Sequence, residues 1–355
     1  MKVLIVGAGP TGLTAGMELA RRGIDATIID KRVGGSTLSR AVGIVPFSLK
    51  LLEPTGVASR LIAEGQQMQN VKFYAGDELA ATLPLQVKHP KFGYDFILML
   101  PQDQTEAALR DAFTELGGSV RYSTEFAGLS QEGDKVTVAL ADGSTEAYDY
   151  VIGADGIKSS VRPALGLEYP GYELPARWSV ADVNCTDWQN PKDFTICVLT
   201  EGKVAVVAPI AENRCRVISN TPDSVETLPL PMKVSHVNRA GEFEISVRQV
   251  AKYRMGRVFL AGDAAHCHSP VGGRGMNLGI ADACELADCL QAGDLDRYEA
   301  ERHKEGAATI KGSEGVRKMV SSTNPVTRTA FRTALRLVNN VGFIQGRMAE
   351  GFLYG

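Results

Sequence analysis

The stretch GDAAHCHSPVGGRGMNLG, residues 262–279, gathers several side chains that can do chemistry. His266 and His268 would share one face of an extended strand, where two imidazoles can chelate one metal ion. Cys267 beside a histidine could be a thiol nucleophile, but no third group that would orient the pair is evident. A metal site needs three or four ligands, and the other histidines lack ligand spacing. We therefore expect neither a metal site nor thiol catalysis, and the five glycines leave a third possibility, a backbone cradle for a large anionic group.

The length and charge of the chain exclude several classes of protein. Its 355 residues predict two or three folding units. The formal net charge of -3, without any run of basic residues, argues against binding to nucleic acid or to anionic lipid. The N-terminal residues lack the apolar core of a signal peptide, and no window approaches a membrane span. The six cysteines show no paired spacing, so we expect reduced thiols in a cytoplasmic protein that does not enter a membrane.

The first thirty residues have the pattern of a β-α-β unit. Residues 3–6, VLIV, are an unbroken apolar run typical of a strand buried on both faces of a parallel sheet. Helical apolar spacing follows from residue 12 to residue 22, and ATIID, residues 26–30, predicts a second buried strand. A right-handed crossover then fixes the topology of the unit.

Between the first strand and the helix lies GAGPTG, residues 7–12, which fits the pattern G-x-G-x-x-G. Gly7 allows the tight turn, Gly9 lets the backbone approach a pyrophosphate, and Gly12 lets helix and strand pack closely. The helix N-terminus would face the phosphates with free N–H groups and its positive dipole end. Asp30 ends the second strand, where a carboxylate accepts hydrogen bonds from ribose hydroxyls. The unit predicts dinucleotide binding without choosing between NAD and FAD.

The remaining pattern predicts sheet material inserted twice into a discontinuous cofactor domain. Short strands between turns over residues 172–250 indicate an antiparallel meander, and GRVFLAGDA then returns to the buried parallel type. Beyond about residue 295 the spacing is helical, with Pro325 as the one clear breaker. Other expected elements are a helix over roughly 46–65, a hairpin turning at 75–77, a helix at about 103–116, and strands near 120–128, 135–140 and 146–153.

Two later stretches choose between the dinucleotides. YVIGADGIKSSVR, residues 150–162, places Asp155 and Gly156 after an apolar strand, and residues 262–279 place Gly262 and Asp263 after another. Together with GAGPTG, they make the chain resemble the single-component FAD-dependent aromatic hydroxylases, the family typified by para-hydroxybenzoate hydroxylase. The three fingerprints occur in the family's order, and the resemblance covers about residues 1–310.

The resemblance implies an α/β fold with a Rossmann-like FAD-binding domain of the glutathione reductase type, an inserted antiparallel β-sheet substrate domain and C-terminal helices. We expect the discontinuous FAD-binding domain to comprise residues 1–70, 100–171 and 254–300. The substrate domain would comprise residues 71–99 and 172–253, and residues 301–355 would form the helical C-terminal segment.

The resemblance also implies which residues hold FAD. They are Gly7, Gly9, Pro10, Thr11, Gly12, Asp30, Lys31, Arg32, Arg40, Gln102, Asp155, Gly156, Arg162, Gly262, Asp263, Pro270, Gly273, Gly275, Met276 and Asn277. In this assignment Arg40 contacts the cofactor, Gln102 meets the ribityl chain and Asp263 accepts from a ribityl hydroxyl. Asp155 lies on the pyrophosphate side, and Arg162 lies near the path of the nicotinamide donor. Residues 273 and 275–277 present backbone N–H groups to the flavin N1–C2=O edge, where negative charge builds on reduction.

The resemblance further implies a monooxygenase that hydroxylates an aromatic, usually phenolic, or polyketide-like small molecule. NADH or NADPH reduces FAD, O2 adds to give a flavin hydroperoxide, and one oxygen atom passes to the substrate. Because the cofactor carries this chemistry, no acid–base pair is required of the protein. The alternative is a FAD-dependent reductase or dehydrogenase of the same fold that does not incorporate oxygen. We expect a monomer or a homodimer.

Any catalytic base must come from the region 172–250, where Tyr172, Arg177, Arg214 and Arg216 are weak candidates. Strand alternation places Arg214 and Arg216 on one face, so both could line a pocket or both could face solvent, which is the commoner outcome for arginines. Arg274 stands where many relatives carry glutamine. It could tune flavin reduction, meet an anionic substrate or point to solvent.

Overall fold

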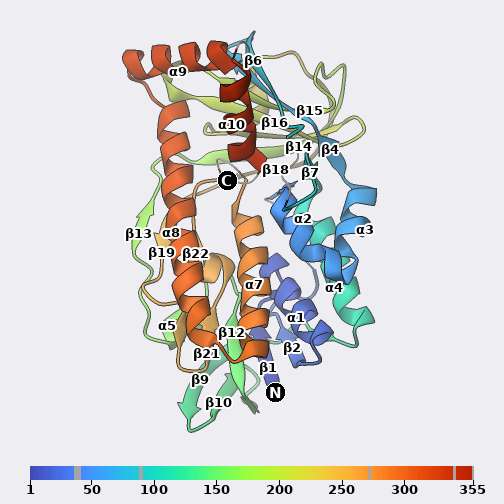
Figure 1. Cartoon of the computed structure of the whole chain (residues 1–355), viewed down its shortest axis with the longest axis vertical. Helices are drawn as coiled ribbons and strands as arrows, with labels where there is room; N and C mark the ends of the chain where they lie inside the picture. Colours follow the sequence, from blue (N-terminus) through green and yellow to red (C-terminus); the bar gives the residue numbers. More distant parts are fainter. Residues whose placement is uncertain (36–40, 88–90, 271–272, 339–340, 354–355) are drawn as a thin grey trace.

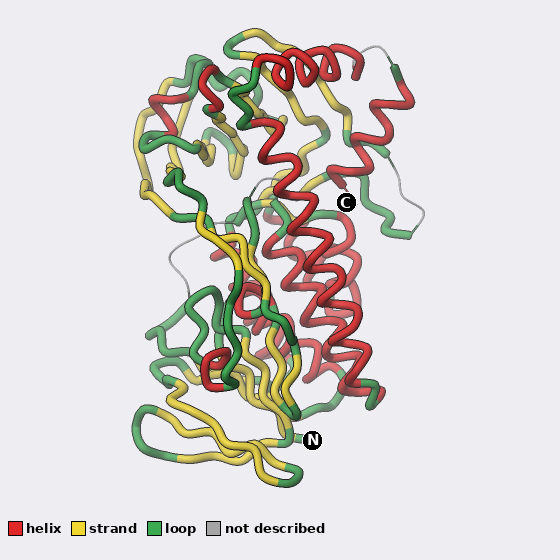
Figure 2. The backbone as a smooth tube through the Cα atoms, turned by 90° about the vertical axis from the view of Figure 1, so that its left-hand side faces the viewer, coloured by secondary structure: helices red, strands yellow, loops and turns green. Residues whose placement is uncertain are grey.

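The computed structural model describes residues 1–35, 41–87, 91–270, 273–338 and 341–353. Figure 1 shows a lower part that contains the N-terminus and is built on a parallel sheet, and an upper part built on a larger sheet. The long helix α8 (Leu295–Val320) runs alongside both parts. Figure 2, turned by 90°, shows the helices stacked on one side of the lower strands. No helix in these described ranges is long and apolar enough to cross a membrane.

The lower sheet has six strands in the order β20-β21-β12-β1-β2-β8, and all neighbours are parallel except β20 and β21. Four of the five residues of β1 are buried, as the unbroken apolar run predicts. The strands come from three separate parts of the chain. Their bounds are β1 Lys2–Val6, β2 Asp25–Ile29, β8 Ser119–Arg121, β12 Tyr150–Gly153, β20 Arg254–Met255 and β21 Val258–Leu260.

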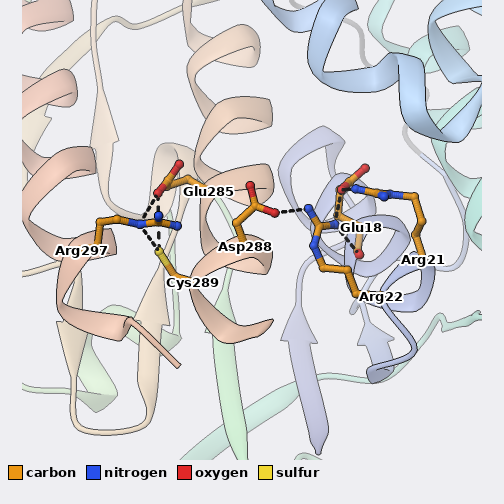
Figure 3. Close-up of polar contacts among 7 residues, drawn as sticks. All are labelled: Glu18, Arg21, Arg22, Glu285, Asp288, Cys289 and Arg297. Atoms are coloured by element: carbon orange, nitrogen blue, oxygen red, sulfur yellow. Dashed lines mark hydrogen bonds and ion pairs between the residues drawn. The ribbon is translucent and has the colours of Figure 1, made fainter. Parts of the chain in front are cut away.

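Helices α1 (Pro10–Arg21), α4 (Gln102–Glu115) and α7 (Gly275–Ala292) share one buried core with the lower sheet, and α8 packs on α7. Figure 3 shows the polar contacts between these helices. Arg22, just after α1, pairs with Glu18 and with Asp288 of α7. Arg297 of α8 lies 3.0 Å from Glu285 of α7 and also contacts Cys289. Paired charges therefore connect α1 to α7 and α7 to α8 in the helical layer on the lower sheet.

Three smaller sheets complete the lower part and its border. One is antiparallel and consists of β9 (Phe126–Glu132), β10 (Lys135–Leu140) and β11 (Thr145–Tyr148). The other two consist of β13 (Gly171–Glu173), β19 (Ser246–Gln249) and β22 (His266–Cys267), and of β3 (Gly43–Ile44), β7 (Ile97–Met99) and β4 (Gln66–Met68).

The structure divides two of the expected strands and one expected helix. The strand expected near 120–128 is β8 and β9, and the one at 146–153 is β11 and β12, because the chain passes between sheets at both places. The helix expected over 46–65 is α2 (Pro46–Leu52), a 3-10 turn (Glu53–Thr55) and α3 (Val57–Glu64). Gly56 separates the pieces with a φ of +74°, a conformation that glycine adopts without strain.

The upper sheet has seven strands in the order β18-β14-β17-β16-β15-β5-β6. The meander expected from 172–250 is antiparallel within itself, but β15 pairs in parallel with β5, which comes from the earlier insertion. The bounds are β5 Asn70–Ala75, β6 Glu78–Pro84, β14 Trp178–Thr186, β15 Asp193–Val198, β16 Val204–Ala211, β17 Arg214–Ser219 and β18 Lys233–Phe243. Two short helices lie in connections between strands. Helix α5 (Val161–Ala164) follows β12 of the lower sheet, and α6 (Ser224–Thr227) follows β17 of the upper sheet.

Helices α9 (Pro325–Val338) and α10 (Gly342–Leu353) cover part of the upper sheet (Figure 1), and Pro325 begins α9 as its sequence position predicts. Leu335 of α9 and Leu353 of α10 are buried in one cluster with Phe73 of β5 and Ile210 of β16. The C-terminal segment is therefore part of the core of the upper sheet.

Candidate functional site

Of the glycines of the first motif, Gly7 and Gly9 lie between β1 and α1 and Gly12 lies in the first turn of α1, and the three serve different purposes. Gly7 has a φ of +108°, and a Cβ there would lie 2.4 Å from the carbonyl oxygen of Ala154. A Cβ on Gly12 would lie 1.9 Å from the carbonyl oxygen of Gly7. A Cβ on Gly9 would meet no protein atom within 4 Å, and no side chain caps the N-terminus of α1 behind it. Open space in front of an uncapped helix N-terminus fits the phosphate groups of a dinucleotide.

Asp30 follows β2 and is buried beside the glycine turn. One carboxylate oxygen accepts from the backbone N–H of Ala8 at 2.8 Å and from Arg32 Nη2 at 2.9 Å. The other accepts from the backbone N–H and the Nε of Arg32. Burial acts to raise the pKa of Asp30, but these hydrogen bonds outweigh it and hold the pKa below its ordinary value. The carboxylate thus fixes the turn, and Lys31 beside it is exposed.

Gln102 is the first residue of α4 and holds the segment that follows residue 40. Its backbone N–H donates to the carbonyl oxygen of Ala41 at 3.1 Å, and its Oε1 accepts from the backbone N–H of Ala41 at 3.3 Å. Its Nε2 donates to Glu106, which lies 3.8 Å from Arg32. Gln102 is therefore connected to the surroundings of Asp30. Arg40 itself lies outside the described residues.

The second motif supplies a cap and a cross-link. Asp155 Oδ2 accepts from the backbone N–H groups of Ser160 (2.6 Å) and Val161 (3.2 Å), at the start of α5, while its buried Oδ1 has no partner. Gly156 has a φ of +79°. Arg162 is buried, and its guanidinium donates to the carbonyl oxygen of Ala264 at 3.0 Å. Arg162 therefore joins the second motif to the third.

Thr11 joins the first motif to the third. A Cβ on Gly262 would lie 2.5 Å from Thr11 Oγ1, and a Cβ on Gly279 would lie 2.2 Å from it. Only glycines at both positions allow α1 to approach the third motif and α7 this closely. The side chain of Asp263, which follows, is exposed beside this contact. The Gly-Asp motif predicted a site role for Gly262, whereas no motif pointed to Gly279.

Asn277 in α7 is fully buried and connects Gly273 to the segment around β3. Its Nδ2 donates to the carbonyl oxygens of Gly273 (2.8 Å) and Gly43 (2.9 Å), and its Oδ1 accepts from the backbone N–H of Val45 at 3.0 Å. Gly273 has a φ of +63°, and α7 begins at Gly275 without a side-chain cap. Met276 is buried and Pro270 is exposed. The N-terminus of α7 thus offers backbone N–H groups beside Gly273, which Asn277 holds.

His266 binds a carboxylate and has no metal-like arrangement with His268. His266 Nε2 lies 2.6 Å from Oδ2 of Asp282, which also accepts from the backbone N–H of Gly262 at 2.9 Å. Arg302 Nε donates to Oδ1 of Asp282 at 2.7 Å. Burial acts to raise the pKa of the Asp282 carboxyl, but His266 and Arg302 outweigh it and hold the pKa at about 2. Asp282 and Arg302 were missed, although the position of Asp282 among apolar residues of the helix is a signal for a buried carboxylate with a partner.

The ring of His268 contacts a backbone carbonyl group, whereas that of His266 contacts a carboxylate. Burial lowers its pKa to about 4, so the ring is neutral at pH 7, and its Nδ1 lies 2.8 Å from the carbonyl oxygen of Ser269. Burial raises the pKa of the Cys267 thiol to about 11, which leaves no thiolate for nucleophilic attack. Within the described ranges, no group of three or more His, Cys, Asp or Glu side chains could hold a metal ion.

A buried ion pair lies on the face of the upper sheet that contacts Ala41. Arg216 is fully buried, which contradicts the expectation that it faces solvent. Its Nε and Nη2 donate to Asp182 of the neighbouring strand at 2.6 and 2.8 Å, and its Nη1 donates to the carbonyl oxygen of Ala41 at 3.2 Å. Arg214 is on the same face, with its Nη2 3.8 Å from Asp182. The cross-strand partner Asp182 compensates the buried charge, and sequence alternation alone could not identify it.

Two other candidates lie at the border of the C-terminal helices. The hydroxyl of Tyr172, in β13, donates to Glu314 of α8 at 2.8 Å, and this hydrogen bond raises the pKa of Tyr172. Tyr172 is therefore outside the seven-stranded sheet and is protonated. Arg274 is half-buried, and its Nη2 donates to the carbonyl oxygen of Gly351 in α10 at 2.6 Å. It joins the loop before α7 to the C-terminal helix.

Comparison with known proteins identifies relatives over nearly the whole chain. A family model described as FAD binding domain matches residues 1–227 and 209–313. Rifampicin monooxygenase of Streptomyces venezuelae is 32% identical over 364 residues, covering 95% of this chain and 75% of that protein. Pentachlorophenol 4-monooxygenase of Sphingobium chlorophenolicum is 31% identical over 349 residues, covering 90% of this chain and 64% of that protein.

A solved structure shares the fold. The crystal structure of p-nitrophenol 4-monooxygenase from Pseudomonas putida DLL-E4 matches with a TM-score of 0.88, over 99% of this chain and 97% of that chain, at 22% identity. The likeness confirms the expected class, a Rossmann-like FAD domain with a β-sheet substrate domain.

Proposed function

Because this chain belongs to the FAD binding domain family and is a FAD-dependent monooxygenase, we propose that it hydroxylates a small phenolic or polyketide-like aromatic compound, with NADH or NADPH as reductant and O2 as co-substrate. The relatives support this function rather than the alternative of a reductase that does not incorporate oxygen. The substrate class is supported by the names of the relatives, which act on rifampicin and on pentachlorophenol.

The observation that carries the proposal is the meeting of three motifs that are far apart in the sequence. Thr11 of the first motif packs against Gly262 of the third, and Arg162 of the second donates to Ala264 of the third. A simple nicotinamide dehydrogenase needs only the first of these motifs. When bound, FAD accepts electrons from the reductant and activates O2, so that one oxygen atom enters the substrate and the other leaves as water.

We assign the two uncapped helix N-termini to the two ends of the cofactor. The N-terminus of α1, opened by Gly9, would hold the pyrophosphate, and Asp30 would hold the adenosine side by fixing the turn. The N-terminus of α7, with residues 273 and 275–277, would stabilise negative charge on the reduced ring through backbone N–H groups. Gln102 and Asp263 would hold the middle of the cofactor, and Asp155 with Gly156 would border the pyrophosphate.

The substrate would lie between the cofactor and the upper sheet. The apolar cluster that α10 completes on this sheet excludes water, which protects the reaction from loss of peroxide. We assign residues 1–70, 100–171 and 254–300 to the cofactor domain, 71–99 and 172–253 to the substrate domain, and 301–355 to the helical segment that covers it. A monomer or homodimer in the cytoplasm stays a prediction.

The test is to purify the protein, record its flavin spectrum, and follow consumption of NADH, NADPH and O2 against a panel of monocyclic and polycyclic phenols. We expect bound FAD, reductant oxidation that a substrate stimulates, and one atom of labelled oxygen from 18O2 in the product. Substrate-stimulated reductant oxidation with no label in the product would favour the reductase, and a protein that does not bind FAD would contradict both.

A further inference from the structure

Tyr169 contacts the third motif, although none of the three motifs contains it. It lies between α5 and β13, and its side chain is partly buried. Its hydroxyl donates to the carbonyl oxygen of Asp263 at 2.8 Å. Burial raises the pKa of Tyr169 above its ordinary value, so the hydroxyl is protonated and is the donor in this hydrogen bond. The peptide group that follows Asp263 is therefore held at its carbonyl oxygen.

Two arginines hold Tyr169 in place. The guanidinium carbon of Arg162 lies 3.9 Å from the centre of the Tyr169 ring, a distance typical of a cation–π contact. Arg248 of β19 donates through Nη1 to the backbone carbonyl oxygen of Tyr169 at 2.9 Å. The ring and the backbone of Tyr169 are thus fixed independently of its hydroxyl, so the hydrogen bond to Asp263 costs little further conformational entropy.

The turn around Asp263 is held at both ends. At its start, Gly262 donates through its backbone N–H to Asp282 of α7 at 2.9 Å. At its end, Tyr169 and Arg162 donate to consecutive carbonyl oxygens, those of the second and third residues of the turn. The side chain of Asp263 is exposed between these contacts. Because side-chain rotamers depend on the backbone conformation, these contacts determine the direction of the carboxylate.

Tyr298 of α8 makes the same kind of hydrogen bond at a different place. Its hydroxyl donates to the carbonyl oxygen of Leu260, the last residue of β21, at 2.8 Å. Both residues are fully buried, so removal of this hydroxyl leaves a buried acceptor without its donor and costs stability. Asp263 is exposed, so its carbonyl oxygen can turn toward water when the hydroxyl of Tyr169 is removed. The two tyrosines therefore separate support of the fold from control of one peptide group.

We propose that Tyr169 is a positioning residue for the cofactor, which fixes the direction in which Asp263 presents its carboxylate to the ribityl chain. The inference deepens the proposed function and rests on it, because it takes the ribityl chain as the ligand of Asp263. A hydrogen bond weakens steeply as its angle departs from linearity. Rotation of the peptide group at Asp263 therefore weakens FAD binding without unfolding the protein. Arg162, which also donates to the carbonyl oxygen of Ile157 at 2.9 Å, connects this contact to the second motif.

Equilibrium titration of the FAD-free protein with FAD, followed by flavin fluorescence, tests this role without turnover. The variants are Tyr169→Phe and the matched control Tyr298→Phe, each alone and combined with Asp263→Ala. We expect Tyr169→Phe to weaken FAD binding about fivefold, the effect of one hydrogen bond. The melting temperature of the FAD-free variant should stay within about 1 °C of the wild type. Tyr298→Phe should lower that temperature by about 3 °C and keep FAD affinity within about twofold.

The double variants show whether Tyr169 acts through Asp263. In Asp263→Ala, where the carboxylate is absent, Tyr169→Phe should weaken FAD binding further by less than about twofold, because the two residues affect one interaction. The proposal is overturned if Tyr169→Phe binds FAD as tightly as the wild type, or if its effect is as large in Asp263→Ala as alone. Loss of folding in Tyr169→Phe without FAD would also overturn it, because the hydroxyl would then support the fold.

The same samples separate this inference from the proposed function. If the wild type binds FAD but puts no label from 18O2 into a product, the proposed function fails, and the titration still decides the role of Tyr169. If Tyr169→Phe binds FAD like the wild type while labelled product forms, the positioning role fails alone. A wild type that binds no FAD contradicts both.

Discussion

Gly9 and Gly12 differ in what a methyl group would meet. At Gly12 the added carbon would lie 1.9 Å from the carbonyl oxygen of Gly7, whereas at Gly9 it would enter open space. Gly9 also has a φ of -82° and a ψ of -177°, which alanine adopts freely. The fold therefore requires glycine at position 12, whereas at position 9 only the proposed ligand would require it, although the motif treats the two alike.

We expect Gly12→Ala to destabilise the FAD-free protein by about 1–3 kcal/mol, because the turn or α1 must shift to relieve the contact. Gly9→Ala should leave the FAD-free stability unchanged within about 0.5 kcal/mol and weaken FAD binding at least tenfold, because the methyl group occupies ligand space. Thermal unfolding without FAD and fluorescence quenching on FAD titration measure the two effects. Equal loss of stability in both variants would contradict this division of roles.

Single residues also show where sequence reasoning stops. The spacing of Asp30 after GAGPTG could be predicted, because strand and turn lengths set it. The two hydrogen bonds that the Arg32 side chain donates to the Asp30 carboxylate could not be predicted, because they depend on a side-chain conformation. The partner of Arg216 was unpredictable for a related reason: Asp182 is 34 residues away and meets it only through the pairing of β14 and β17.

Among the elements, β22, α7 and α8 are joined at Asp282. His266 belongs to β22, Arg302 to α8, and the backbone N–H of Gly262 belongs to the third motif. The carboxylate is fully buried, so its stability depends on all three partners. The positions of Gly262 and His266 therefore depend on Asp282, a residue that the motif does not mark.

We expect Asp282→Asn to destabilise the protein by about 3–5 kcal/mol, because Arg302 keeps a buried charge without its partner. The carboxyl pKa of about 2 lies below the unfolded value of 3.8, so its contribution is complete above about pH 4 and is lost as the pH falls toward 2. Urea unfolding between pH 6 and pH 3 measures this. The wild type should lose more stability than the variant over that range, by about 1–2 kcal/mol, and parallel pH profiles would contradict the assignment.

Arg274 connects the start of α7 to α10, a contact that no sequence pattern predicted. Its hydrogen bond to the carbonyl oxygen of Gly351 attaches α10 to the loop before α7. We expect Arg274→Gln to loosen α10 and to raise the rate of tryptic cleavage after the exposed Arg347 about fivefold, as expected for the loss of one hydrogen bond. Cleavage elsewhere in the chain serves as the control. An unchanged cleavage rate together with unchanged flavin reduction and substrate affinity would make Arg274 a surface residue without a role.

The element boundaries show a similar limit to sequence reasoning. Apolar patterns predicted β1, β2 and α4, because β1 is buried over four consecutive residues, β2 ends in two buried residues and α4 buries one face. They joined β11 to β12 and β8 to β9, because periodicity does not record that the chain changes sheets between them. The parallel pairing of β15 with β5 was missed for the same reason, since it joins two insertions that are separate in the sequence.

In the molecule as a whole, the three motifs meet only because strands from distant parts of the chain lie side by side. β1, β12 and β21 are neighbours in the lower sheet, and each is followed by one motif. The order and spacing of the motifs were enough to predict the class of fold and the cofactor. The contact of the upper sheet with Ala41 was not predictable, because it depends on how one sheet is placed against the other.

FAD binding should stabilise the molecule by mass action, because the proposed site exists only when α1, α7 and the three motifs are together. At free FAD 100-fold above its dissociation constant, the gain is about 2.7 kcal/mol. For a chain of this length that corresponds to a rise in melting temperature of roughly 5 °C. Thermal unfolding at increasing FAD concentration measures it, and the rise should continue logarithmically beyond saturation. With FAD affinity lowered tenfold or more, Gly9→Ala should show about half of this rise or less at the same FAD concentrations. An equal rise in Gly9→Ala would place the cofactor away from the N-terminus of α1, and no rise in the wild type would exclude a site assembled by folding.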